Sequence, residues 1–136
     1  MGFFDHRRLR RTVLEIYAIM GAEMKRPSEK TVEKEIQKVL SALRPYRPKK
    51  VILFGSFARG DYHGLSDLDL IVIKETPKRF VDRIVEVLEL CDSAIPVEPL
   101  VYTPAEMEQL LAEGNVFVSE ALKEGRVLYD EAQEGG

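Results

Sequence analysis

The stretch GSFARGDYHGLSDLDL (residues 55–70) follows directly on VILF (51–54), a short apolar run bounded by turn signals. Such a run is typical of a strand that is buried on both faces of a sheet. Within the stretch, SFAR favours a short helix and DYHGLS favours a loop. A second apolar run begins inside the stretch, so residues 67–73 (DLDLIVI) are predicted to form the next strand.

The rest of the chain shows helical and strand patterns on both sides of this stretch. Helical spacing of apolar residues, or start and stop signals, predicts helices at 5–25, 29–44, 78–92, 103–114 and 115–124. Strand patterns occur at 95–102 and 126–129. We therefore predict an α/β (α+β) fold with a small mixed sheet flanked by helices. The expected organisation is an N-terminal helix in residues 1–28, one domain at 29–130 and a disordered tail at 131–136.

Proline and threonine residues mark several of the expected boundaries. Thr103 and Pro104 are predicted to cap and begin a helix, and Thr76 is predicted to cap the helix that starts near residue 78. Pro99 has no N–H to donate to a neighbouring strand, so the strand at 95–102 is expected at an edge of the sheet or at a bulge. The residues expected to face inward from the helix at 78–92 are Phe80, Ile84, Val87, Leu88 and Cys91.

The composition excludes several kinds of protein. Cys91 is the one cysteine among 136 residues, so an internal disulfide and a cysteine-based zinc site are both excluded. No apolar run is long enough to cross a membrane, and the N-terminus lacks the pattern of a signal peptide, so a cytoplasmic protein is expected. The basic run RRLRR (7–11) has no aromatic platform around it. We therefore expect neither a membrane nor a nucleic-acid partner.

Asp67 and Asp69 are one residue apart in the second predicted strand. Because side chains alternate between the two faces of a strand, both carboxylates lie on one face, with Cα atoms roughly 6.8 Å apart. Leu68, Leu70 and Val72 then face the core. Two catalytic metal ions typically lie about 3.5–4 Å apart, a spacing that this pair can bridge. Carboxylates and substrate phosphates are the ligands that Mg²⁺ prefers, so a magnesium site is predicted here.

The turn before the loop has the features of a phosphate site. Gly55 lacks a side chain where the backbone must approach a ligand. Ser56 adds a hydroxyl group and, if it opens a helix, free backbone N–H groups that attract phosphate. Arg59 either contacts phosphate or pairs with Asp61. Each feature alone is common, but chance seldom supplies a glycine turn followed at this distance by paired aspartates.

The residues GSFARG and SDLDL resemble the G-S-x-A-R-G…S-D-x-D motif of nucleotidyltransferases related to DNA polymerase beta. The short length and the stretch VFVSEALKEGRVLYD are similar to the minimal nucleotidyltransferases, which are often encoded beside a HEPN-domain partner. The resemblance covers roughly residues 30–130 and is most specific at the motif. It implies the nucleotidyltransferase fold, ATP as substrate and two Mg²⁺ ions.

The resemblance also implies a role for each residue of the motif. Gly55 and Ser56 would hold the β- and γ-phosphates of ATP, and Asp67 and Asp69 would hold the Mg²⁺ ions. The other candidate nucleotide-binding residues are Arg59 and Ser66.

Glu98 occupies the position at which the family usually has a third carboxylate, where an aspartate is expected in the minimal members. Two interpretations remain open: Glu98 is a metal ligand or general base, or it is a charged residue on an edge strand. Phe57 and Tyr102 are aromatic candidates for stacking on adenine.

By resemblance, the leading function is transfer of AMP from ATP to a tyrosine of a HEPN-type toxin, for which this chain is the antitoxin. One alternative is an adenylyltransferase for a small hydroxylated molecule such as an aminoglycoside, since 17 acidic and 7 basic residues follow residue 50. Another is an inactive relative that only docks on its partner. The sequence leaves the acceptor, the base preference and homo- or hetero-oligomerisation open.

Overall fold

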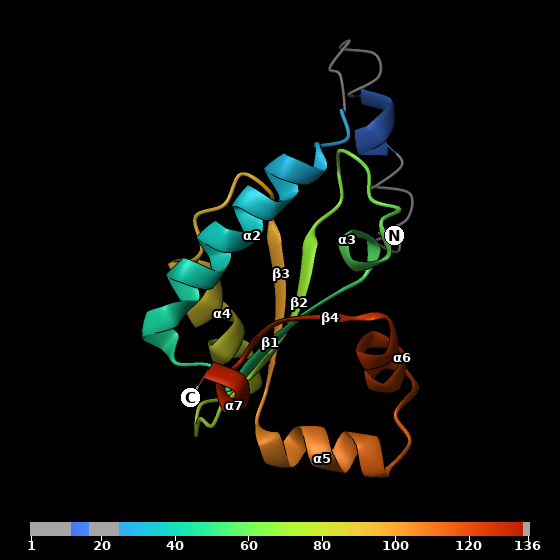
Figure 1. The fold of residues 1–136 in the computed structure, drawn as a ribbon. Coiled ribbons are helices and arrows are strands. Elements are labelled where there is room, and N and C mark those ends of the chain that lie inside the picture. Colours follow the sequence, from blue (N-terminus) through green and yellow to red (C-terminus); the bar gives the residue numbers. More distant parts are fainter. Residues whose placement is uncertain (1–11, 17–24, 135–136) are drawn as a thin grey trace, which may run out of the picture.

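The computed structural model describes residues 12–16 and 25–134 of the chain. Figure 1 shows the elements in chain order. They are α2 (Glu29–Leu43), the 3-10 helix η1 (Arg44–Tyr46), β1 (Lys50–Phe54), α3 (Ser56–Arg59), β2 (Leu68–Ile73), α4 (Phe80–Leu90), β3 (Val97–Tyr102), α5 (Pro104–Ala112), α6 (Val116–Glu124), β4 (Arg126–Asp130) and α7 (Glu131–Glu134). The predicted fold class and the predicted order of elements from residue 29 to residue 129 are confirmed.

The four strands form one mixed sheet in the order β3-β2-β1-β4. β1 runs antiparallel to both β2 and β4, whereas β2 and β3 are parallel. β3 therefore lies at an edge, as Pro99 predicted, because a residue without an N–H is tolerated there. The parallel pair requires a crossover connection, and α4 supplies it.

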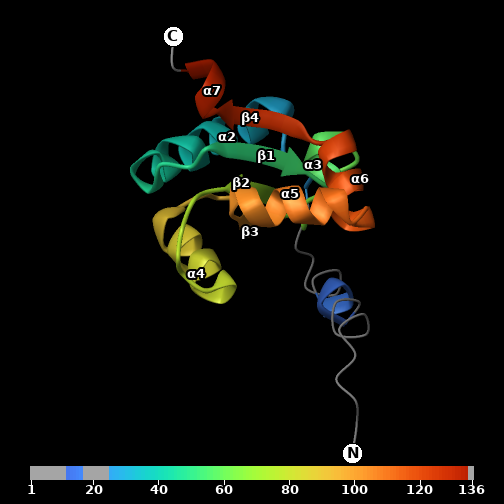
Figure 2. The same cartoon turned by 90° about the horizontal axis from the view of Figure 1, so that it is seen from below.

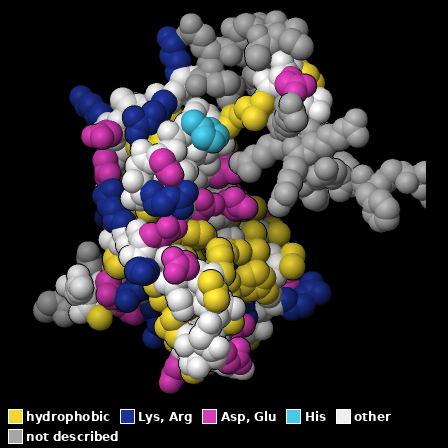
Figure 3. Space-filling model, turned by 90° about the vertical axis from the view of Figure 1, so that its right-hand side faces the viewer, with side chains coloured by type: hydrophobic (Ala, Val, Ile, Leu, Met, Phe, Trp, Pro, Cys, Tyr) yellow, Lys and Arg dark blue, Asp and Glu magenta, His cyan; other side chains and the backbone are white. Residues whose placement is uncertain are grey.

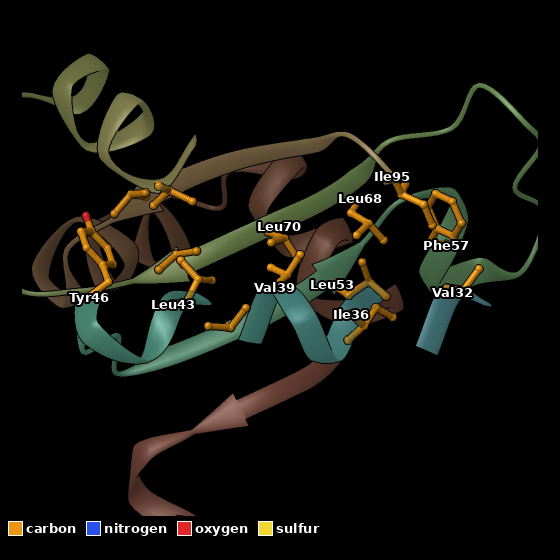
Figure 4. Packing of buried hydrophobic residues seen from close by; sticks show 14 of the residues in the cluster. Val32, Ile36, Val39, Leu43, Tyr46, Leu53, Phe57, Leu68, Leu70 and Ile95 are labelled. Atoms are coloured by element: carbon orange, nitrogen blue, oxygen red, sulfur yellow. The ribbon is translucent and has the colours of Figure 1, made fainter. Parts of the chain in front are cut away.

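The two faces of the sheet are covered to different extents. Figures 1 and 2 show α2 and α4 against one face, and α5 and α6 against the other. Figure 4 shows Ile36 and Val39 of α2 packing against Leu53 and Leu70 of the sheet. Among the described residues, this first core contains 15 buried hydrophobic residues, whereas the core under α5 and α6 contains five, namely Ile52, Ile71, Met107, Val118 and Ala121. The described part of the chain therefore fills one side of the sheet well and covers the other side thinly.

The helix boundaries agree with the capping chemistry except at α4. Thr103 and Glu106 form the predicted capping box at the start of α5. The prediction that Thr76 caps the next helix was wrong, because the N-cap of α4 is Arg79. The inward face of α4 also differs from the prediction: Val87 is buried, but Leu88 is 46% exposed.

A buried arginine explains this difference at α4. Arg83 donates to the carbonyl oxygen of Val101 on β3 at 3.1 Å and to the Glu106 carboxylate at 2.6 Å. The guanidinium thus joins α4, β3 and α5, with its charge paired as a buried charge requires. The spacing of apolar residues alone does not predict which face of α4 is buried, because Arg83, a charged residue, occupies one of the inward positions.

The two ends of the chain differ in how far the structure tests the predictions. Residues 12–16 are helical, within the helix expected at 5–25, and the rest of that segment up to residue 24 lies outside the described residues. The predicted disordered tail instead begins with the helix α7 (Glu131–Glu134). Glu131 N–H donates to the carbonyl of Lys49, and the Asp130 side chain accepts from Ala132 N–H, so this turn is tied to the sheet.

Gly125 makes the close approach that places α6 against the sheet. A Cβ atom there would lie 2.5 Å from the Ala121 carbonyl oxygen and 2.8 Å from Ile52 Cγ2. We predict that Gly125→Ala lowers the free energy of unfolding by about 3 kcal/mol, the upper end for overpacking, because backbone must move. Gly114→Ala is the control, since its Cβ would meet nothing within 4 Å and only its left-handed φ of +70° is unfavourable, at about 1 kcal/mol. Urea denaturation measures both losses, and a loss at Gly125 no larger than at Gly114 would contradict this packing.

Candidate active site

The predicted site residues converge at one end of the sheet, where β1 ends and β2 begins. There they line a pocket with a volume of ≈ 570 Å³. All seven residues singled out from the sequence are among its walls: Gly55, Ser56, Arg59, Ser66, Asp67, Asp69 and Glu98. The elements that carry them are the turn at Gly55, the helix α3, the loop before β2, and the beginnings of β2 and β3.

The strand register brings the carboxylates together. Asp69 on β2 is paired with Phe54 on β1 and with Glu98 on β3, so Asp69 and Glu98 are direct neighbours across the parallel pair. β2 begins at Leu68, one residue later than predicted, so Asp67 lies immediately before the strand. The prediction that the alternate residues Leu68, Leu70 and Val72 face the core is confirmed, since all three are buried.

The surroundings of Asp69 raise the pKa of its carboxyl group. Burial raises the pKa of Asp69 to about 7, with further contributions from a hydrogen bond to Glu98 and from the negative charges of Glu98 and Asp67. The charge of Arg59 opposes this rise in pKa without cancelling it. In the protein alone, negative charge at this point is therefore under-compensated, and a cation placed among the carboxylates would be stabilised.

Two features of the structure require glycine at position 55, namely its backbone conformation and the lack of space for a Cβ atom. Its φ of +74° lies in the left-handed region that favours glycine. A Cβ atom there would lie 2.2 Å from Asp69 Oδ2, closer than any real contact. The glycine predicted from the turn therefore leaves space for the aspartate predicted from the strand, and the two form one unit.

Arg59 is engaged with protein carboxylates. Its Nε lies 3.3 Å from Asp61, which is the pairing that the sequence left open, and its Nη1 donates to Glu124 Oε1 at 3.1 Å. The same Glu124 oxygen accepts the backbone N–H of Gly55 at 3.3 Å. Donors from the turn and from α3 thus already hold an anionic group, contributed by the last residue of α6.

The loop between α3 and β2 is closed by short-range contacts. The Ser66 hydroxyl is buried and accepts the backbone N–H of His63 at 2.9 Å, so this side chain shapes the loop as well as lining the pocket. Phe57 stacks on Tyr62 with ring centroids 4.5 Å apart. The guanidinium carbon of Arg26 lies over the Tyr62 ring, 4.2 Å from its centroid. Phe57 is therefore committed to the core, and neither it nor Tyr102 is among the pocket residues.

The donor set suits a magnesium ion that completes its coordination elsewhere. As the side chains lie, no group of three His, Cys, Asp or Glu among the described residues could hold a metal ion. Mg²⁺ usually binds one or two carboxylates together with substrate phosphates and water. Asp67 and Asp69, next to an under-compensated charge cluster, meet that requirement when phosphate oxygens supply the rest.

Sequence reasoning missed the wall of the pocket formed by α6. The residues from this side are Val116, Phe117, Glu120, Ala121 and Glu124, and Phe54 of β1 joins them. Phe54 and Phe117 form an edge-to-face pair with centroids 5.6 Å apart, so they are the aromatic side chains at this pocket. The helical pattern of α6 gives no local signal of a pocket wall, because the pairing of β4 with β1 and the packing of α6 on Ile52 bring this helix beside the motif.

Comparison with known proteins identifies the class. Residues 33–129 match the family model described as the nucleotidyltransferase domain, and the chain belongs to this family. It is 33% identical over 103 residues to “Putative protein adenylyltransferase MJ0604” of Methanocaldococcus jannaschii, covering 71% of this chain and 97% of that one. A second relative from the same organism, “Putative protein adenylyltransferase MJ0141”, is 51% identical over 45 residues, which is 32% of this chain and 46% of the relative.

Solved structures show the same fold at low sequence identity. A nucleotidyltransferase from Sulfolobus solfataricus, described as putative, aligns with a TM-score of 0.51 at 19% identity over 81% of this chain and 94% of that one. A structure described as “the toxin-antitoxin with AMP-PNP” aligns with a TM-score of 0.50 at 22% identity, over 73% and 76% of the two chains. The protein is thus a nucleotidyltransferase by fold, by family and by motif. Among the described residues, no helix is long and apolar enough to span a membrane.

The Gly55–Asp69 contact gives a direct test of the site. We predict that Gly55→Ala lowers the rate of nucleotidyl transfer by roughly 10²-fold, because displacement of Asp69 by about 1 Å misplaces the reacting groups. Gly60→Ala is a matched control, since Gly60 also has a left-handed φ (+92°) but nothing within 4 Å of a Cβ. Both variants lose about 1–2 kcal/mol of stability through the backbone, and only Gly55→Ala loses activity. Equal activity of the two variants would show that the contact with Asp69 has no catalytic importance.

Proposed function

We propose that this nucleotidyltransferase moves AMP from ATP to a hydroxyl group of a partner protein, namely a tyrosine of a HEPN-type toxin. The observation that carries the proposal is that six motif residues and Glu98 line one pocket. The names of the relatives, protein adenylyltransferases, support a protein acceptor. The structure described as a toxin-antitoxin with AMP-PNP is in line with an ATP-like substrate and a partner chain.

The turn at Gly55 is proposed to hold the triphosphate. No side chain caps the start of the short helix α3, and its first residue, Ser56, lines the pocket. Gly55 N–H and Arg59 already hold the Glu124 carboxylate, and phosphate oxygens are acceptors of the same kind. ATP would displace Glu124 from these donors. Ser56 and Ser66 are proposed as further contacts, since both line the pocket.

Asp67 and Asp69 are proposed to hold two Mg²⁺ ions together with the triphosphate. When bound, Mg²⁺ neutralises charge on the phosphates and makes the acceptor hydroxyl more acidic. Ionised Asp69 is unfavourable in the protein alone, because its pKa is raised to about 7. A bound cation would therefore stabilise the ionised form of Asp69.

The proposed reaction is an in-line displacement at the α-phosphorus. A bond forms between the acceptor oxygen and the α-phosphorus, the bond from that phosphorus to the bridging oxygen breaks, and pyrophosphate leaves. The hydroxyl proton must be removed, and Glu98 is the proposed base or third metal ligand, because it is exposed beside Asp69. We also propose that the reaction takes place in the cytoplasm, where ATP is present.

One alternative acceptor is favoured by a specific observation. Asp61, Glu120 and Glu124 surround the pocket in addition to the predicted carboxylates. An acidic rim suits a cationic substrate, so a small hydroxylated amine such as an aminoglycoside is the second candidate.

The test uses co-expression with the protein encoded beside this chain, followed by addition of ATP and Mg²⁺. We predict that intact-mass spectrometry shows AMP added to the partner by the wild-type chain. Asp69→Asn slows this transfer by at least about 10²-fold, since loss of a metal ligand removes several kcal/mol of transition-state stabilisation. Asp92→Asn, an exposed aspartate outside the pocket, is the control and leaves the rate unchanged.

Two results would contradict the proposal. Transfer that proceeds equally well with Asp69→Asn would remove the site from the chemistry. ATP consumption only when an aminoglycoside is supplied would establish the small-molecule alternative.

A further inference from the structure

The face of the sheet that carries the carboxylates is the thinly covered one. Asp69 alternates along β2 with Leu68 and Leu70, which pack under α2, and it shares its face with Ile71, which packs under α5 and α6. Several hydrophobic side chains on this side are only partly buried, namely Phe54, Ile73, Tyr102, Leu110 and Leu122. The catalytic pocket therefore opens beside incompletely covered apolar surface.

Exposed side chains of α5 and α6 extend this apolar surface. Leu111 is 43% exposed, Val116 74% and Phe117 46%. Together with the partly buried Phe54 and Leu110, they define what we call the α5–α6 surface. Figure 3 shows a broad hydrophobic area on this side of the molecule, directly next to a band of acidic side chains. Contiguous exposed apolar area of this kind is typical of a protein interaction site.

The α5–α6 surface is continuous with the pocket. Phe54, Val116 and Phe117 belong to both, and the edge-to-face contact of the two phenylalanines forms the border between them. An acceptor that approaches the carboxylates from the side of α6 crosses this border, since Phe54 and Phe117 line the pocket together with Asp67 and Asp69. A large acceptor would therefore rest on the apolar surface while its hydroxyl is in the pocket.

The charges beside this border indicate the chemistry of the acceptor. Asp61, Glu120 and Glu124 lie at the pocket, and the nearby Arg59 is already shared between Asp61 and Glu124. Glu120 on α6 is exposed. A matching partner presents apolar side chains for the α5–α6 surface and a Lys or Arg near its acceptor hydroxyl.

We propose that the α5–α6 surface is the docking site for the acceptor protein, an inference that rests on the proposed protein adenylylation. The occupant is a protein surface with an apolar centre and a basic edge that flanks the modified residue. A second copy of this chain fits less well, because its own acidic rim would lie against the acidic rim here and like charges repel. A small-molecule acceptor would leave the apolar surface uncovered.

The test compares two exposed apolar residues on different helices. Leu111 belongs to the α5–α6 surface and does not line the pocket, whereas Val85 on α4 is similarly exposed, at 45%, on the other side of the sheet. Leu111→Ser and Val85→Ser are each assayed for AMP transfer to the protein encoded beside this chain, at low partner concentration, and for binding of Mg-ATP. Tenfold weaker apparent affinity for the partner with Leu111→Ser, with unchanged Mg-ATP binding and an unaffected Val85→Ser, is the expected result.

Every other outcome separates the two proposals. If Leu111→Ser transfers AMP as well as the wild type, or if Val85→Ser is the variant that fails, the docking site is wrong and protein adenylylation stands. If no variant, wild type included, modifies the protein although Mg-ATP binds, the proposed protein acceptor and its docking site both fail. A dimer in light scattering that Leu111→Ser dissociates would assign the surface to a second copy instead.

Discussion

The register of β1, β2 and β3 is the constraint on which the site depends. It pairs Asp69 with Glu98 on one side and with the last residue of β1 on the other. The glycine that follows β1 leaves the space that the Asp69 carboxylate occupies, since a Cβ at Gly55 would lie 2.2 Å from it. A one-residue slip of any of these strands would separate the carboxylates or turn them into the core. The strand register thus sets the positions of these carboxylates in the protein without a bound ligand.

This arrangement stores an unfavourable electrostatic interaction in the folded protein. Negative charges accumulate at the ends of two strands, and the nearby Arg59 is shared with Asp61 and Glu124. Burial of the Asp69 carboxyl group raises its pKa to about 7, and the hydrogen bond to Glu98 and the charges of Glu98 and Asp67 add to this rise. The well-packed core under α2 supports this end of the sheet from one face, whereas the described residues of α5 and α6 cover the other face thinly. One face of the sheet therefore carries most of the hydrophobic core, and the opposite face carries the pocket.

The sequence was sufficient for the parts of the site that are local. A glycine turn after a buried strand and two aspartates at a spacing of two residues are short-range patterns, and the structure brings Gly55, Asp67 and Asp69 to one pocket. The fold class and the edge position of β3 also followed from short patterns, through strand periodicity and Pro99. The positions of most helices agreed with their cap and stop residues.

What the sequence could not predict depends on contacts between distant residues. The α6 wall, with Phe117 and Glu124, comes to the pocket through the pairing of β4 with β1 and the packing of α6 on the sheet. The inward face of α4 was misassigned because Arg83 pairs with Glu106, 23 residues away. Phe57 was a candidate for stacking on adenine, but its ring belongs to the core under α2 and stacks on Tyr62, so it does not line the pocket.

We expect the clustered carboxylates to hold a proton that a metal-bound nucleotide replaces. Calorimetric titration of the protein with Mg-ATP, in buffers of different ionisation enthalpy and without acceptor, measures the protons released on binding. Because the pKa of Asp69 is raised to about 7, we predict release of about one proton per chain near pH 6 and close to none near pH 8. Binding that releases the same number of protons at both pH values would contradict it.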